Sequence, residues 1–188
     1  MITGPSPGDE PRDVVRADGA GRAHRRAWLA GAVAGGVLGA DAVTKAWALG
    51  QVGMVTGPAP AFVQVRHVTN AGAALGLGAQ HPALVLALAL VATAVVLWWW
   101  VAATGLVEQV AVAVLLGGAL GNLGDRVLNG AVTDWVHVAW YPPTFNLADV
   151  AIRGGALVAV AAHVWTGSTN PNSRMRPKMG NTDGSDAR

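Results

Sequence analysis

Two aspartates lie beside the ends of strongly apolar segments, where a charge is costly to bury. Asp134 occurs in the run Val132-Thr133-Asp134-Trp135, and Asp149 closes the run Phe145-Asn146-Leu147-Ala148-Asp149. An ionisable residue at a membrane boundary is by default a functional candidate. Two carboxylates can share one proton, so that one activates a water molecule while the other holds the proton. The pair predicts acid–base hydrolysis, and the alternatives are two solvated loop carboxylates or, for Asp149, an N-cap of the next helix.

The sequence lacks cysteine and the motifs of other common catalytic chemistries. The chain contains no cysteine, which excludes disulfides, thiolate catalysis and cysteine-ligated zinc. Its histidines are scattered, and no two have the four-residue spacing of a helical zinc site. The sequence has neither a G-x-S-x-G serine motif nor a phosphate-binding loop. We therefore expect no metal and no cofactor, and carboxylate chemistry is the main option.

The composition is that of a membrane protein. Of the 188 residues, 52% are hydrophobic and only 13% are charged, whereas soluble domains contain about 25% charged residues. The charge is also segregated, because arginines and lysines gather near both ends of the chain. Between these ends the only cationic residues are Lys45, Arg66, Arg126 and Arg153. A nucleic-acid-binding protein would need a basic face on a folded surface, so no nucleic-acid partner is expected.

Four apolar segments are candidate membrane spans of roughly 20 residues each. They cover about residues 27–49, 82–106, 107–124 and 150–166. Residues 61–68 and 132–138 contain alternating and β-branched residues that are typical of short strands. The predicted fold is an all-α membrane protein with four transmembrane helices and a small extracytoplasmic β-element. We expect this domain to span residues 27–166, between disordered cytoplasmic tails at 1–26 and 167–188.

The positive charges predict the orientation of the chain. Five arginines precede the first apolar segment, and the tail after the last segment is also basic. Because cytoplasmic loops carry the excess of lysine and arginine, both termini should be cytoplasmic. Residues 50–81 and 125–149 then lie on the outer side. Both candidate aspartates are therefore expected at the outer face of the membrane.

Other polar residues could support the aspartates from the predicted helices. Asp41 and Lys45 are four residues apart, so they share a helix face and either form a simple ion pair or line the site. Asn122, Asp125 and Arg126 also point to one side of a helix, although the last two could merely cap it. Asn70, in the run Asn70-Ala71-Gly72, is explained equally well by turn chemistry.

Five motifs occur in order over about residues 40–155. They are Asp41-Ala42-Val43-Thr44-Lys45, Asn70-Ala71-Gly72-Ala73-Ala74, the run from Gly117 to Arg126, Gly130-Ala131-Val132-Thr133-Asp134-Trp135, and Phe145-Asn146-Leu147-Ala148-Asp149-Val150-Ala151-Ile152. In this order and with four spans, the sequence resembles the lipoprotein signal peptidase (signal peptidase II) family, the membrane aspartyl endopeptidases of bacteria.

The resemblance implies an activity and a set of site residues. It implies removal of signal peptides from lipid-modified prolipoproteins, by cleavage before the diacylglyceryl-modified cysteine, at the outer face of the bacterial cytoplasmic membrane. Membrane lipids are then its other partners. It makes Asp134 and Asp149 the catalytic pair, and it implies no cofactor. Around them it places Asp41, Lys45, Asn70, Gly72, Asn122, Asp125, Arg126, Asn146 and Ala148.

Two other functions fit part of the pattern. A small ion- or proton-coupled transporter would also carry acidic and basic residues within its spans. Such a protein needs polar residues along a route to both faces, whereas here most of them gather toward one face. A non-catalytic membrane scaffold would instead tolerate replacement of both Asp134 and Asp149.

Overall fold

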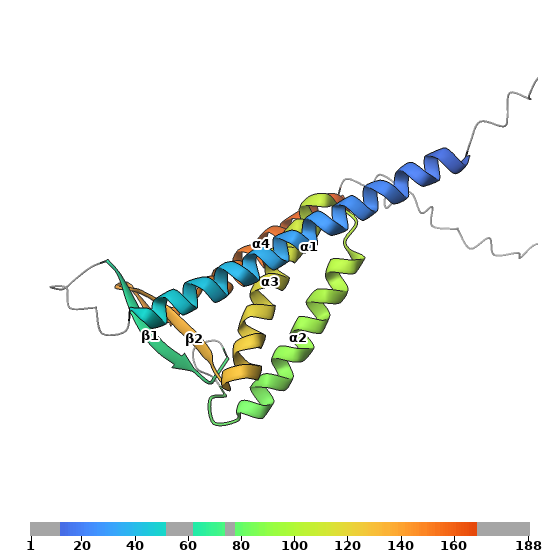
Figure 1. The fold of residues 1–188 in the computed structure, drawn as a ribbon. Coiled ribbons are helices and arrows are strands. Elements are labelled where there is room, and N and C mark those ends of the chain that lie inside the picture. Colours follow the sequence, from blue (N-terminus) through green and yellow to red (C-terminus); the bar gives the residue numbers. More distant parts are fainter. Residues whose placement is uncertain (1–11, 52–61, 74–77, 169–188) are drawn as a thin grey trace, which may run out of the picture.

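Four helices and a small sheet make up the fold. The computed structural model describes residues 12–51, 62–73 and 78–168. The N-terminus of α1 and the C-terminus of α4 lie at the end of the helices away from the sheet (Figure 1). The elements, in chain order, are α1 (Arg12–Gly50), β1 (Val63–Asn70), α2 (Pro82–Ala102), α3 (Leu106–Asn129), β2 (Val132–Val138), β3 (Tyr141–Phe145) and α4 (Leu147–Ser168).

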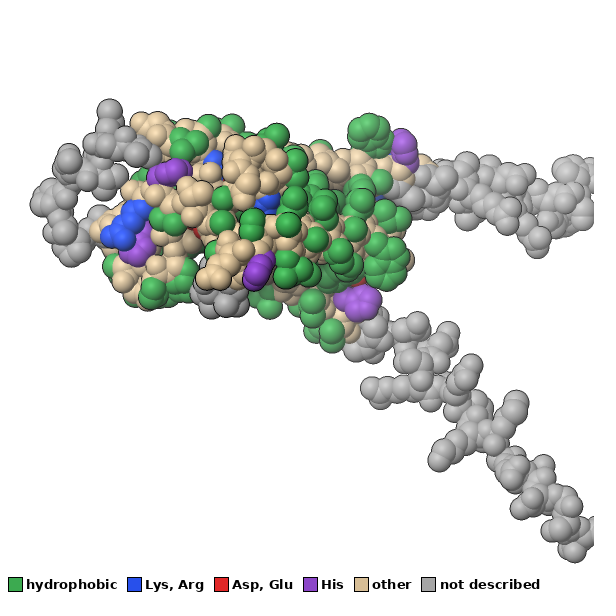
Figure 2. All heavy atoms as spheres, turned by 90° about the horizontal axis from the view of Figure 1, so that it is seen from below, with side chains coloured by type: hydrophobic (Ala, Val, Ile, Leu, Met, Phe, Trp, Pro, Cys, Tyr) green, Lys and Arg blue, Asp and Glu red, His purple; other side chains and the backbone are tan. Residues whose placement is uncertain are grey.

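All four helices contain a stretch that is long and apolar enough to cross a membrane. These stretches are His24–Gly50, Pro82–Ala102, Leu106–Asn129 and Leu147–Trp165. Many large apolar side chains point outward from them, including Leu88, Trp98 and Leu157, and hydrophobic side chains gather over the helical part of the face in Figure 2. Apolar surface of this extent fits a lipid environment. The predicted fold class of four membrane helices with a small sheet is confirmed, and the protein is a multi-pass membrane protein.

Helix α3 is the centre of the helical part. In its most apolar window 56% of the residues are buried, against at most 22% in the other three helices. Small residues allow this packing. A Cβ added at Gly117 would lie 2.6 Å from the main-chain oxygen of Ala34 on α1, and one at Gly118 would lie 2.6 Å from that of Ala148 on α4. Glycine at these two positions therefore lets α3 approach α1 and α4 closely.

The sheet has three antiparallel strands in the order β1-β2-β3 and adjoins the C-terminal end of α1 (Figure 1). Strand β1 pairs with β2 over Asn70↔Val132 and Val68↔Asp134, so Asp134 is held by the central strand. Strand β3 was not predicted, because it contains Pro142 and Pro143. Proline cannot donate to a strand ladder and is tolerated at an edge, which is where β3 lies.

Several predicted boundaries were wrong. Helix α1 begins at Arg12, so residues 12–26 are helical and do not belong to the predicted disordered tail. Arginine and alanine are strong helix formers, and extending an existing helix costs little. Helix α3 continues past residue 124 to Asn129 and stops where Gly130 adopts a left-handed φ of 74°. Residues 1–11 and 169–188 of the predicted tails lie outside the described residues.

Candidate active site

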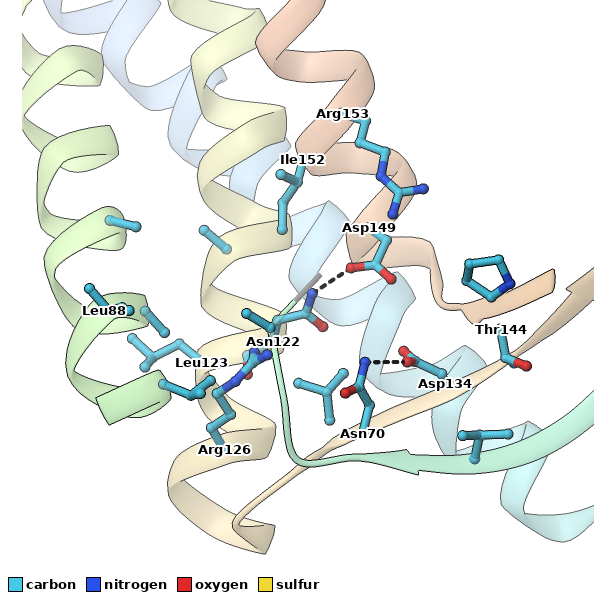
Figure 3. A pocket seen from close by; sticks show the side chains of 18 of the residues that line it. Asn70, Leu88, Asn122, Leu123, Arg126, Asp134, Thr144, Asp149, Ile152 and Arg153 are labelled. Carbon is cyan, nitrogen blue, oxygen red and sulfur yellow. Dashed lines mark hydrogen bonds between the residues drawn. The ribbon is translucent and has the colours of Figure 1, made fainter. Parts of the chain in front are cut away.

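Asp134 and Asp149 line one cavity between the helices and the sheet (Figure 3). Asp134 comes from β2 and is only 2% exposed, while Asp149 lies in the first turn of α4. The cavity has a volume of about 1030 Å³. Its apolar part comes largely from α2 and α3, including Val85, Leu88 and Leu123. Two carboxylates thus face a space that is partly polar and partly apolar, at the sheet end of the membrane helices.

Asn146 connects the two acids. Its side-chain nitrogen donates a hydrogen bond to Oδ1 of Asp134 at 2.8 Å. Its side-chain oxygen accepts the main-chain N–H of Asp149 at 2.9 Å, and Oδ2 of Asp149 accepts the main-chain N–H of Asn146 at 3.5 Å. This reciprocal pattern is that of a capping box. The alternative of Asp149 as the N-cap of α4 was therefore wrong, because Asn146 caps the helix and Asp149 stands three residues further along the chain.

Asn122 connects Asp149 to the rest of the network. From α3 its side-chain nitrogen donates to Oδ1 of Asp149 at 2.9 Å. Its side-chain oxygen accepts hydrogen bonds from Asn146 at 3.1 Å and from Lys45 at 3.3 Å. An amide has separate donor and acceptor atoms, so Asn122 can bind a carboxylate and an ammonium group at once. Its two polar ends fix the position of Asp149 relative to α1 and α3.

The end of β1 brings a second side chain to Asp134. The side-chain nitrogen of Asn70 donates to Oδ2 of Asp134 at 3.1 Å, and its side-chain oxygen accepts the main-chain N–H of Gly72 at 3.0 Å. The main-chain oxygen of Gly72 accepts a hydrogen bond from Nη2 of Arg126 at 2.9 Å, while Nη1 donates to the main-chain oxygen of Asn122 at 3.1 Å. The Nε–H of Arg126 is buried and has no partner among the described residues, so one donor of this guanidinium remains unused beside the cavity.

A buried ion cluster supports the network. Nζ of Lys45 lies 2.6 Å from Asp41 and 2.9 Å from Asp125. The other oxygen of Asp41 accepts the main-chain N–H of Ala148 at 2.9 Å, and Asp125 accepts that of Thr133 at 3.0 Å. The cluster therefore joins α1 and α3 to the chain segments that carry the two acids. Asp41 and Lys45 do form the intrahelical ion pair that was one alternative. Neither lines the cavity, but hydrogen bonds to Asn122 and Ala148 link them to the network around the two acids.

Burial raises the pKa of Asp134 to about 6. The hydrogen bond from Asn70 opposes this shift, the neighbouring charge of Asp149 adds to it, and Asn146 and Lys45 oppose it. The environment of Asp134 thus favours its protonated form more than water would. A carboxylic acid of this kind can donate a hydrogen bond or a proton to a bound substrate.

The structure brings all eleven residues expected at the site into one connected network, including the small residues Gly72 and Ala148. Sequence reasoning missed two parts of the cavity wall. One is β3, which was not predicted as a strand because of its two prolines and which contributes Tyr141, Pro142, Pro143 and Thr144. The other is Arg153 of α4. Its four-residue spacing from Asp149 could have identified it, since residues so spaced share a helix face.

No metal centre is evident in the part of the chain that the structure describes. Within residues 12–51, 62–73 and 78–168, no group of three or more histidine, cysteine, aspartate or glutamate side chains is arranged to hold a metal ion. The polar atoms of the site are instead largely bound to one another. The arrangement can accept and release protons at two carboxylates and can donate hydrogen bonds from Arg126.

Comparison with known proteins identifies the family. The family model for signal peptidase (SPase) II matches residues 33–165 of this chain. The lipoprotein signal peptidase of Thermosynechococcus vestitus is 36% identical over 141 residues, covering 71% of this chain and 89% of that protein. The lipoprotein signal peptidase of Mycolicibacterium smegmatis is 33% identical over 203 residues, covering 93% of this chain and 79% of that protein.

Solved structures show the same fold. A bacterial membrane enzyme determined by the in meso method at 2.3 Å resolution superposes with a TM-score of 0.64 and 25% sequence identity, covering 76% of this chain and 92% of that one. A second, determined at 1.9 Å, gives a TM-score of 0.58 and 26% identity, covering 72% of this chain and 92% of that one. The residues that match the family model include the hydrogen-bonded network around Asp134 and Asp149 and parts of all four membrane helices. The chain therefore belongs to the signal peptidase II family.

Proposed function

We propose that this protein is a membrane aspartic endopeptidase that removes the signal peptide from prolipoproteins, with Asp134 and Asp149 as its catalytic pair. Membership of the signal peptidase II family supports the reaction, and it decides against the transporter. The assignment of these two residues is supported by Asn146, which forms hydrogen bonds with both acids, and by the cavity that both acids line. Two carboxylates fixed at one cavity are what hydrolysis by a shared proton requires.

The proposed reaction uses water as the nucleophile. One carboxylate takes a proton from the water molecule, whose oxygen then bonds to the carbonyl carbon before the modified cysteine. The other donates a hydrogen bond or a proton to the carbonyl oxygen. Collapse of this intermediate breaks the carbon–nitrogen bond, and a proton passes to the leaving amine. The raised pKa of Asp134 favours it as the member that holds the proton, which leaves Asp149 as the base.

The cavity suits a substrate that is anchored in lipid. Its acids lie at the sheet end of the helices, while its apolar wall runs along α2 and α3 (Figure 3). The apolar wall would accept the acyl chains of a diacylglyceryl group, and the unused Nε–H of Arg126 would donate to a substrate carbonyl. We place this end of the protein at the outer face of the bacterial cytoplasmic membrane, with both termini cytoplasmic, because the arginines cluster at the opposite end.

A reconstituted assay with a lipidated prolipoprotein tests the proposal. Asp134→Asn and Asp149→Asn should each abolish cleavage, because a neutral amide can neither accept nor release the proton. Glu108→Gln is a matched control, since Glu108 is a buried carboxylate that binds Trp99 and His163 near the other end of α3. It should cleave at close to the wild-type rate. Retention of full activity by either aspartate variant, with unchanged size-exclusion and thermal-unfolding profiles, would rule out this catalytic pair.

A further inference from the structure

Arg153 is a cation at the site that lacks a partner within the described part of the chain. Lys45 is paired with two carboxylates, and Arg126 donates to two main-chain oxygens. Arg153 forms no hydrogen bond and no ion pair with any residue that the structure describes. It is exposed and lies near the start of α4, at the sheet end of a membrane-spanning stretch. An arginine near a helix end can reach the polar membrane interface, so its N–H donors are available to a substrate that enters the cavity there.

Arg153 lies close to Asp149 along α4. It is four residues after Asp149 on α4, which corresponds to about 6 Å along the helix axis and the same helix face. Both residues line the cavity. In Figure 3 the side chain of Arg153 extends from α4 toward Asp149, and Leu88 and Leu123 lie on the far side of Asn122 from the two acids. The cavity therefore has an apolar arm along α2 and α3 and, beside the acids, an arm that contains the guanidinium of Arg153.

A signal peptide presents a matching group at this depth. Its apolar segment must be helical within the bilayer, because each backbone polar group needs an internal partner there. The last four carbonyls of a helix nevertheless lack such partners, and they carry a partial negative charge. Since cleavage occurs just beyond the apolar segment, these carbonyls reach the site together with the scissile bond. An arginine offers five N–H donors and no acceptor, which is complementary to a cluster of carbonyl oxygens.

We propose that Arg153 binds the C-terminal end of the signal-peptide helix and donates hydrogen bonds to its unpaired carbonyls. This inference rests on the proposed peptidase function and assigns the two arms of the cavity. The arm with Arg153 receives the peptide, and the apolar arm along α2 and α3 receives the acyl chains. Arg153 is then a substrate-binding residue that recognises a helix end without reading its sequence, so it serves substrates with different signal peptides.

Two substrates distinguish binding of a helix end from an effect of Arg153 on every substrate. The first is a full-length lipidated prolipoprotein, and the second is a lipopeptide with only four residues before the diacylglyceryl cysteine, which is too short to form a helix. For the full-length substrate, Arg153→Gln should raise KM by about tenfold to a hundredfold, because hydrogen bonds to a charged donor are lost. Its kcat should change by about threefold or less. For the lipopeptide the KM penalty should shrink to about twofold, and Arg153→Lys should recover part of the loss on the full-length substrate.

A control variant and two membrane compositions separate binding of a helix end from binding of a lipid phosphate. Arg66→Gln removes an exposed arginine of β1 that binds the neighbouring Gln64, and it should leave both KM values unchanged. An equal penalty on both substrates would overturn the proposal, since the helix end would then be irrelevant. A penalty seen in vesicles containing phosphatidylglycerol but not in pure phosphatidylcholine would also overturn it and would assign Arg153 to a lipid phosphate. Failure of the wild-type protein to cleave either substrate would overturn the peptidase function itself.

Discussion

The side-chain nitrogen of Asn146 lies 2.8 Å from a carboxylate oxygen of Asp134, which joins the residue that caps α4 to the central strand of the sheet. The same side chain accepts the main-chain N–H of Asp149 with its oxygen. One amide therefore sets the position of both acids relative to each other. Because it is fully buried, water cannot readily replace it when it is removed, and both hydrogen bonds would be lost together.

Replacement of Asn146 should separate its capping role from its bridging role. Asn146→Ala removes both, so kcat should fall by about tenfold to a hundredfold, and helix stability should fall by about 1 kcal/mol. Asn146→Asp keeps an acceptor that can cap α4 but loses the donor to Asp134. It should recover thermal stability relative to the alanine variant without recovering kcat. Wild-type kcat in the aspartate variant would show that the hydrogen bond to Asp134 is unnecessary.

The pH profile of cleavage should depend on Asn70. The pKa of Asp134 is about 6, and the hydrogen bond from Asn70 keeps it from rising further. If the protonated acid is required, kcat/KM should fall as pH rises through the upper pKa of the coupled pair. Asn70→Ala removes a donor that favours the charged form of Asp134, so the fall in kcat/KM should move to higher pH. Gln64→Ala, a matched amide deletion on the same strand, should leave it in place, and a shift to lower pH in Asn70→Ala would contradict the assignment.

The free energy of unfolding should depend on pH because of Asp134. Its pKa is about 6 in the folded state against 3.8 ordinarily, so the folded protein binds more protons between these values. The contribution to stability is therefore fully present below about pH 4 and is lost as pH rises through about 6. Relative to Asp134→Asn, the wild type should lose up to about 3 kcal/mol in the free energy of unfolding between about pH 4 and pH 7. Parallel curves for the two proteins, measured by unfolding in detergent, would contradict the raised pKa.

The sequence allowed the membrane helices and the polar residues of the site to be predicted, for physical reasons. Spans of about twenty apolar residues are a local property of the chain, and charged residues within them are rare enough to stand out. Asp41 and Lys45 were recognised as sharing a face because their spacing alone determines it. The resemblance to the family added Gly72, Asn146 and Ala148. The contacts of Gly72 and Ala148 are made by main-chain atoms, which no side-chain pattern reveals.

Other features depend on tertiary structure and could not be predicted. Strand β3 contains two prolines and exists because β2 offers it an edge to pair with. Asp149 was the N-cap considered for α4 from sequence, whereas the hydrogen bonds between Asn146 and Asp149 show that Asn146 caps the helix. The four-residue spacing of Arg153 from Asp149 places both on one face of α4, but it does not show what that face borders. The structure shows that Arg153 lines the cavity.

The absence of cysteine makes the proposed orientation directly testable. His67 is exposed on β1 at the sheet end, and Thr104 is exposed in the short connection between α2 and α3. If the site faces outward, His67→Cys should react with a membrane-impermeant maleimide in intact spheroplasts, whereas Thr104→Cys should react only after lysis. The wild-type chain is the unlabelled control. The reverse pattern would place the site at the cytoplasmic face.

Lys45 should be essential for folding rather than for proton transfer. It is 5% exposed and pairs with Asp41 and Asp125, of which Asp41 is 1% exposed. Removing one partner of a buried ion pair leaves an uncompensated charge and typically costs about 3–5 kcal/mol. Lys45→Met should therefore lower the unfolding temperature sharply. Adding Asp41→Asn and Asp125→Asn should restore much of the stability, because the two carboxylate charges that lost their partner are then removed as well. If Lys45→Met instead kept the wild-type unfolding temperature and lost only activity, Lys45 would act in the chemistry and not in support of α1 and α3.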